Sequence, residues 1–299
     1  MKRLHRKRDA AALSSRLIRR PIQRMVWLFL LPTFAAFCIG FLYPFLKGAF
    51  LSFCKFKLTS QWTWVGFDNY VKAFSDSSFL HAFWYTALFA LVSVAFINVL
   101  AFTVAYFLTK GIKGSNLFRT VFFMPNLIGG IVLGYIWSMI FDGILVKYNT
   151  SVVLESKYGF WGLIILMCWQ QVGYMMIIYI AGLQSIPEDM LEAARIDGAG
   201  RIKQFFSITL PMISPTLFVT LIMRMMASLK VYDLIYMMID QSNPVLPDVQ
   251  SLMYLFYREA FVAGNKGYAS AIVIWTIFLI GIVTVIQFIG QKKWVNYDV

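Results

Sequence analysis

The sequence predicts an all-α integral membrane protein with six transmembrane helices. Of its 299 residues, 60% are hydrophobic and only 14% are charged, whereas soluble domains are about 45 to 50% apolar and about 25% charged. A bilayer core about 30 Å thick requires about 20 apolar residues in a helix, and six such runs occur. The third observation is an excess of basic residues, 27 Lys and Arg against 14 Asp and Glu. The six runs are Met25–Phe45, Ala82–Leu108, Val121–Phe141, Phe160–Leu183, Thr216–Ile239 and Tyr268–Ile289.

The first run is predicted to be a retained signal-anchor helix. It is longer than the 7 to 15 apolar residues typical of a cleaved signal peptide, and it lacks a cleavage site of small residues. The tail before it carries nine basic residues against the single acid Asp9, which places the N-terminus in the cytoplasm by the positive-inside rule. Six spans return the C-terminus to that side. The predicted parts are a basic tail (1–24), a six-helix domain (25–290) and a cytoplasmic C-terminal tail (291–299).

The distribution of charge agrees with this orientation. Under this topology the inner segments hold 17 basic and 6 acidic residues, and the outer segments hold 8 and 7. The net charge of +13 therefore indicates cytoplasmic loops and not a nucleic-acid partner. The three cysteines, Cys38, Cys54 and Cys168, lie far apart with no histidine nearby, so neither a metal site nor a disulfide framework is predicted.

The inner loop at residues 185–211 is mixed in charge and is predicted to form a helix-turn-helix. Pro187 suits the first turn of a helix, and Gly198 suits the left-handed position that ends one. A second short helix fits from Arg201 to Thr209. This loop therefore requires a structural reason other than charge bias.

The same loop carries a motif. It reads Glu192-Ala193-Ala194, Asp197-Gly198-Ala199, Ile208 and Leu210-Pro211. This spacing resembles the EAA loop in permease subunits of binding-protein-dependent ATP-driven importers. The resemblance covers about residues 25 to 290 and is similar to the carbohydrate branch, the maltose and glycerol-phosphate type permeases, which implies the type I ABC importer permease fold. Further matching segments are Tyr43-Pro44, Val65 to Tyr70, Phe118-Arg119-Thr120, Ala181 to Pro187, Lys230 to Leu234 and Gly267 to Ala271.

The resemblance implies that the loop couples the membrane helices to a cytoplasmic ATPase. Small side chains allow close approach of a partner, and two acids can meet basic or amide groups on it; capping within the hairpin is the alternative role for these acids. The expected coupling residues are Glu192, Ala193, Ala194, Asp197, Gly198 and Ala199.

The remaining expectations concern partners and location. The chain has no GxxxxGK[ST] phosphate loop, so it is expected to be a transport subunit without enzymatic activity, with no catalytic residue, metal or bound cofactor of its own. ATP and Mg belong to the partner ATPase. The resemblance implies a second permease subunit, two cytoplasmic ATP-binding subunits and an extracellular or periplasmic solute-binding protein, in a prokaryotic cell (inner) membrane and in contact with its lipid.

Polar residues inside apolar spans are candidates for binding a sugar, because polar groups are costly in a membrane. The fourth run holds Gln170, Gln171 and Tyr174, with Gly173 allowing a ligand or a neighbouring helix to approach. Ser228 and Tyr232, four residues apart, are expected on one helical face of the fifth run. Asn126 is a weaker candidate, and hydrogen bonding between helices is the alternative for all of these residues.

Three charged residues also fall within the fifth run. Lys230 and Asp233 are spaced to pair, and Arg224 is expected to extend toward the inner surface or to meet a partner chain. A phosphorylated or acidic sugar is expected to recruit a cation such as Arg224 or Lys230. The alternative function is a secondary transporter or channel that works without ATP, driven by an ion gradient.

Overall fold

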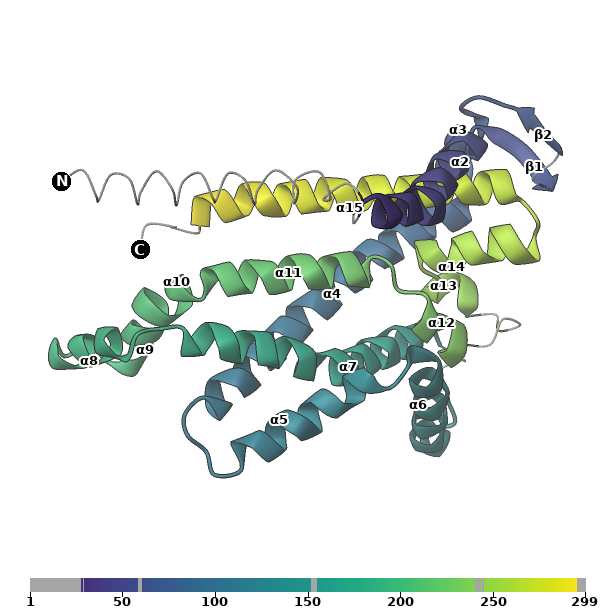
Figure 1. Cartoon of the computed structure of the whole chain (residues 1–299). Helices are drawn as coiled ribbons and strands as arrows, with labels where there is room; N and C mark the ends of the chain where they lie inside the picture. The colour runs from purple at the N-terminus through teal and green to yellow at the C-terminus, as the bar shows by residue number, and fades with distance from the viewer. Residues whose placement is uncertain are drawn as a thin grey trace, which may run out of the picture.

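The computed structural model describes residues 28, 30–58, 61–151, 155–239, 243 and 245–294. Figure 1 shows long helices running between two ends of the molecule, with a helical hairpin at one end and a two-stranded sheet at the other. Within the described residues, five helices are long and apolar enough to cross a membrane, and a bent pair of helices adds a sixth. The predicted six-helix fold class is therefore confirmed. The basic tail predicted at 1–24 and residues 295–299 lie outside the described part.

The first span extends from Leu30 to Leu51, beyond the predicted end at Phe45. Pro44 has no N–H to donate to the preceding turn, and the five residues Cys38–Leu42 form a π-helical turn immediately before α2 (Tyr43–Leu51). The span therefore continues through the proline with a local change of helix type.

A short antiparallel sheet follows the first span, which the sequence did not indicate. Cys54 pairs with Trp64 across its two strands. The Asn69 amide donates hydrogen bonds to the backbone carbonyls of Ser52 (2.8 Å) and Cys54 (3.0 Å) and so fixes the chain at this point. The elements are β1 (Cys54–Leu58), β2 (Gln61–Trp64) and α3 (Asp68–Ser75).

Two long helices, α4 (Ser77–Leu108) and α7 (Ser156–Gln184), form the centre of the fold. They correspond to the second and fourth predicted spans. The Asp76 carboxylate accepts a hydrogen bond from the backbone N–H of Ser78 (2.9 Å), which satisfies one of the free donors at the start of α4. The core between these helices contains fully buried side chains such as Phe89.

The third predicted span, Val121–Phe141, is interrupted. Helix α5 (Ser115–Phe123) passes into a 3-10 turn that contains Pro125, and α6 (Gly130–Leu145) starts after a break. A proline cannot continue the helical hydrogen bonds, and the extended residues Ile128 and Gly129 separate the two helices. The prediction of one continuous helix over this run is wrong, and the apolar stretch suited to crossing is Gly130–Tyr148.

The fifth predicted span, Thr216–Ile239, is also wrong as a single helix. Helix α11 (Ser214–Ser228) ends at Ser228, and α12 (Asp233–Met238) starts after a non-helical break. On its other side α11 joins the helical segment Arg201–Met212 at a bend of 63°.

The chain then returns to the predicted sixth span, which is confirmed within α15 (Lys266–Trp294). Gly267, near its start, packs so closely on the backbone carbonyl of Cys54 that a Cβ at this position would overlap it. This contact ties α15 to the small sheet. Two short helices, α13 (Leu246–Val249) and α14 (Leu252–Tyr257), precede α15 in the chain.

Candidate functional site

The predicted helix-turn-helix is present at the end of the molecule opposite the sheet (Figure 1). The first arm of this hairpin is helix α8 (Glu188–Ile196), which starts after Pro187. The second arm begins with α9 (Arg201–Gln204). A π-helical turn over Phe205–Thr209 and α10 (Leu210–Met212) continue that arm. The second helix is therefore longer than the predicted Arg201–Thr209.

Gly198 has a φ of +76°, the left-handed conformation expected for the residue that ends a helix. The turn is closed by the N–H of Ala199, which donates to the carbonyl of Ala194 (2.9 Å), and by the N–H of Asp197, which donates to Ala193 (2.9 Å). The Gln204 amide adds a hydrogen bond to the Ala199 carbonyl (2.7 Å). Backbone hydrogen bonds thus hold the two arms in a defined geometry.

The acidic residues of the motif are exposed. Among the described residues, the Glu192 and Asp197 carboxylates have no hydrogen-bond or ion-pair partner, so neither side chain caps the hairpin. Large apolar side chains also face outward here: Ile196 is 86% exposed and Ile202 is 76% exposed. Surfaces of this composition, apolar with adjacent charges, are typical of protein interaction sites.

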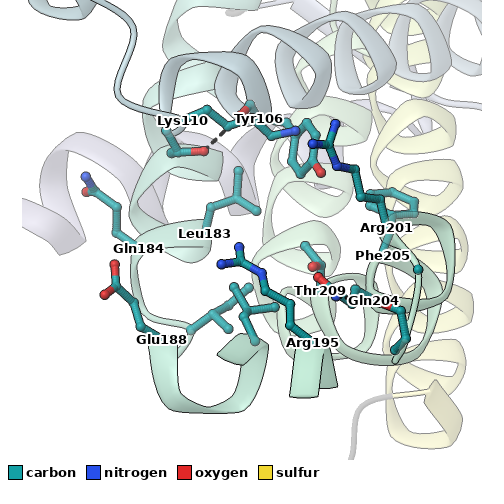
Figure 2. A pocket seen from close by; sticks show the side chains of 15 residues that line it. Tyr106, Lys110, Leu183, Gln184, Glu188, Arg195, Arg201, Gln204, Phe205 and Thr209 are labelled. Atoms are coloured by element: carbon teal, nitrogen blue, oxygen red, sulfur yellow. Dashed lines mark hydrogen bonds between the residues drawn. The ribbon is translucent and has the colours of Figure 1, made fainter. Parts of the chain in front are cut away.

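A cavity of about 1080 Å³ lies between the hairpin and the adjoining ends of α4 and α7. Figure 2 shows Lys110, Arg195, Arg201 and Glu188 around it. The Lys110 ammonium lies 4.0 Å from the centre of the Tyr106 ring, a cation–π contact that holds this side chain in place. The sequence did not indicate this cavity, because its walls combine residues 106–110 with residues 183–209, which are far apart in the chain.

A second set of polar residues lies between α7 and α11. The Arg224 guanidinium donates a hydrogen bond from Nη1 to the Gln171 Oε1 at 2.8 Å, and Arg224 is only 5% exposed. The predicted extension of Arg224 toward the surface is therefore wrong. Cys168 and Tyr174 lie near enough to Arg224 to interact with it electrostatically. Two predicted site residues, Gln171 and Tyr174, are thus brought together with a buried cation.

The other predicted residues of α7, Gln170 and Gly173, have structural partners. Gln170 is buried and donates from its amide to the backbone carbonyl of Ile128 (3.3 Å), which supports the interrupted third span. Gly173 is covered by the backbone of α5, as the prediction of close helix approach allowed. Asn126 is half-buried in the 3-10 turn.

Ser228 and Tyr232 do not share a helical face, because the helix ends between them. Ser228 is fully buried and accepts a hydrogen bond from the Ser93 hydroxyl of α4 (3.1 Å). Tyr232 instead joins a group of tyrosine rings with centroids 5.2 to 6.5 Å apart. Its neighbours are Tyr236, Tyr254 and Tyr257.

The predicted pairing of Lys230 with Asp233 is absent. Across the described part of the chain, the single ion pair is Arg258 with Glu259, at 3.7 Å. The Asp233 carboxylate lies instead against Gly130, the first residue of α6, where the positive end of a helix dipole favours an acid.

This architecture, a bundle of apolar spans with an exposed hairpin at one end and polar groups between its helices, defines a polytopic membrane protein. The model of the family described as "Binding-protein-dependent transport system inner membrane component" matches residues 97–294. The chain belongs to this family and is a transport permease and not an enzyme, as predicted.

Curated relatives cover nearly the whole chain. The probable starch degradation products transport system permease protein AmyD of Thermoanaerobacterium thermosulfurigenes is 34% identical over 276 residues, 89% of this chain and 94% of the relative. The multiple sugar-binding transport system permease protein MsmF of Streptococcus mutans is 31% identical (89% and 95%). The sn-glycerol-3-phosphate permease protein UgpA of Escherichia coli is 30% identical (93% and 99%). The predicted carbohydrate-branch resemblance is confirmed.

Solved structures support the fold. A chain of a bacterial ABC transporter involved in the import of the acidic polysaccharide alginate superposes with a TM-score of 0.80 at 21% identity, covering 93% of this chain and 99% of that one. A chain of the MetNI methionine ABC transporter gives 0.54 at 17% identity, covering 73% and 96%. The predicted type I importer permease fold is confirmed.

Proposed function

We propose that this permease is the translocation subunit of an ATP-driven importer for a sugar or oligosaccharide. The observation that carries the proposal is the hairpin, which presents unpaired acids and exposed apolar side chains on a rigid turn. In the proposed mechanism a separate ATPase, which binds ATP and Mg, docks on this surface. Because a ligand shifts a conformational equilibrium only through its differential affinity for the two states, nucleotide binding drives alternating access through this contact.

The same proposal assigns the remaining subunits. The partners are a second permease, which completes the pore, two ATP-binding subunits and an extracellular or periplasmic solute-binding protein. The hairpin faces the cytoplasm, as do both termini. The relatives' names, which include starch degradation products and sn-glycerol-3-phosphate, support a carbohydrate or related polyol, taken up past Gln171 and Tyr174.

Two glycines of the hairpin provide a matched test. A Cβ added at Gly198 or at Gly200 meets open space, but only Gly198 has a positive φ. Gly198→Val therefore strains the turn, whereas Gly200→Val adds similar bulk without that strain. We expect Gly198→Val to lose the ATPase from gentle pull-downs and to lose ATP-driven uptake, with Gly200→Val much less affected.

The pull-down and uptake results also separate the two functional classes. Equal ATPase retention and uptake in both variants would count against the coupling role of the hairpin. Uptake by the purified chain alone, driven by an ion gradient and without any ATPase, would favour a secondary transporter instead.

A further inference from the structure

Arg224 is a cation inside an apolar span, and none of the residues that the structure describes provides it with a counter-ion. Arg224 is only 5% exposed. Within the described residues, its single hydrogen bond goes to the neutral amide oxygen of Gln171. Its Nε atom is buried with no partner among the described residues. No described carboxylate forms an ion pair with it, since the one ion pair of this part of the chain lies at Arg258 and Glu259.

A charge in this position is costly. Removing an ion from water carries a large penalty that is offset only by an opposite charge and further hydrogen bonds. Ionisable groups within membrane spans generally mark a solute path or meet a partner. The neutral Gln171 oxygen supplies one hydrogen bond but no charge. The guanidinium fork therefore retains unused donors suited to a carboxylate or phosphate.

The neighbours of Arg224 indicate which kind of molecule would carry an anionic group to this site. Gln171 and Tyr174 are half-buried, so they retain access from outside the helix pair, and their amide and phenol groups suit the hydroxyls and the ring face of a sugar. Cys168 and Tyr174 also interact electrostatically with Arg224, and neither side chain is a carboxylate. The cluster thus combines one positive charge with neutral groups that recognise a polyol.

We propose that Arg224 binds an anionic group, a carboxylate or a phosphate, on the transported saccharide, and that this permease selects acidic sugars over neutral ones. The anion replaces the Gln171 oxygen as the acceptor of the Arg224 N–H groups. This inference rests on the proposed transport function and specifies its substrate class.

The test uses the complete importer in lipid nanodiscs and two matched sugar pairs. Galacturonate and galactose differ by a carboxylate, and glucose 6-phosphate and glucose differ by a phosphate, so the pairs distinguish the two anions. The measurement is the shift of the unfolding temperature over a range of sugar concentrations. We expect the acidic member of one pair to bind about tenfold or more tightly than its neutral counterpart.

Variants assign this preference to the guanidinium. Arg224→Gln should abolish the preference, Arg224→Lys should retain part of it because the charge remains, and Lys230→Gln, which removes an exposed cation nearby, should leave it unchanged. The proposal is overturned if the wild-type importer shows no preference within either pair, or if Arg224→Gln retains it. It is also overturned if Arg224→Gln separates the two permeases without any sugar present, because the counter-ion is then an acid of the partner.

The result is distinguishable from failure of the proposed function. ATPase retention and ATP-driven uptake, which depend on Gly198, report the coupling role. Intact coupling together with equal binding of acidic and neutral sugars would refute the inference alone.

Discussion

The backbone of Phe122, near the end of α5, packs directly on Gly173 in the middle of α7. A Cβ on Gly173 would overlap the Phe122 carbonyl and approach the backbone N of Phe123 to 2.7 Å. Since both contact atoms belong to the backbone, the clash cannot be relieved by rotating a side chain. The glycine therefore sets the distance between these two helices, one turn from Gln170 and adjacent to Tyr174.

Replacing Gly173 with alanine should destabilise the permease. Forcing a methyl group into a closed contact typically costs about 1 to 3 kcal/mol, and the expected result is a lower thermal unfolding midpoint of the purified protein in detergent. Gly143→Ala in α6, where a Cβ meets open space, is the matched control and should be neutral or slightly stabilising. Equal midpoints for the two variants would contradict the close packing.

A buried hydrogen-bond chain should also contribute to stability. The Tyr179 hydroxyl donates to Asn98 Oδ1 (2.7 Å) and accepts from the Thr220 hydroxyl (2.8 Å), so it joins α4, α7 and α11. Tyr179→Phe leaves the Asn98 oxygen without this donor, and an unsatisfied buried acceptor costs about 1 to 3 kcal/mol. Unfolding in a graded denaturing detergent measures the loss. Tyr135→Phe, at a side chain 63% exposed, should change stability little, and a loss as large as that of Tyr179→Phe would argue against the chain.

The hairpin could be predicted from sequence because its signals are local. Pro187 precedes the first helix and Gly198 ends it, and each acts through the conformation of its own backbone. The breaks in the third and fifth spans could not be predicted from hydropathy, because the runs of apolar residues continue almost without interruption across both breaks. Pro125 is a local indication of a break in the third run, because proline interrupts a helix. The break after Ser228 contains neither proline nor glycine.

The intramembrane cluster was predictable only in part. Gln171, Tyr174 and Arg224 were individually conspicuous as polar residues in apolar runs. Their mutual position was not, because the hydrogen bond between Gln171 and Arg224 joins residues 53 apart in sequence and depends on how α7 packs on α11. The predicted pairing of Lys230 with Asp233 failed for a different reason, because the helix that would have aligned the two side chains ends at Ser228.

The orientation of the chain can be tested with single cysteines. Cys54 is buried in the small sheet, and burial raises the pKa of its thiol, which slows alkylation at neutral pH because the thiolate is the reactive form. In a background with all three cysteines replaced by serine, Asp189→Cys on the hairpin should react with a membrane-impermeant maleimide only in inside-out vesicles. Lys147→Cys, at an exposed position in the 3-10 turn Val146–Tyr148 that ends the span of α6, should react only in right-side-out vesicles. The reverse pattern would place the hairpin outside and contradict the proposed coupling.

Ile196 provides a test of the docking surface that does not strain the backbone. Its side chain is 86% exposed at the end of α8, so Ile196→Lys should leave the fold and the unfolding midpoint nearly unchanged, as is usual for surface substitutions. If the ATPase covers this residue, burying a lysine there without a partner is costly, and pull-downs should recover at least about tenfold less ATPase, the equivalent of about 1.4 kcal/mol. Val262→Lys, at a side chain 64% exposed after α14, is the control, because it lies far from the hairpin along the bundle. ATPase recovery that falls equally in both variants would indicate a general defect in assembly, and unchanged recovery in Ile196→Lys would exclude Ile196 from the contact.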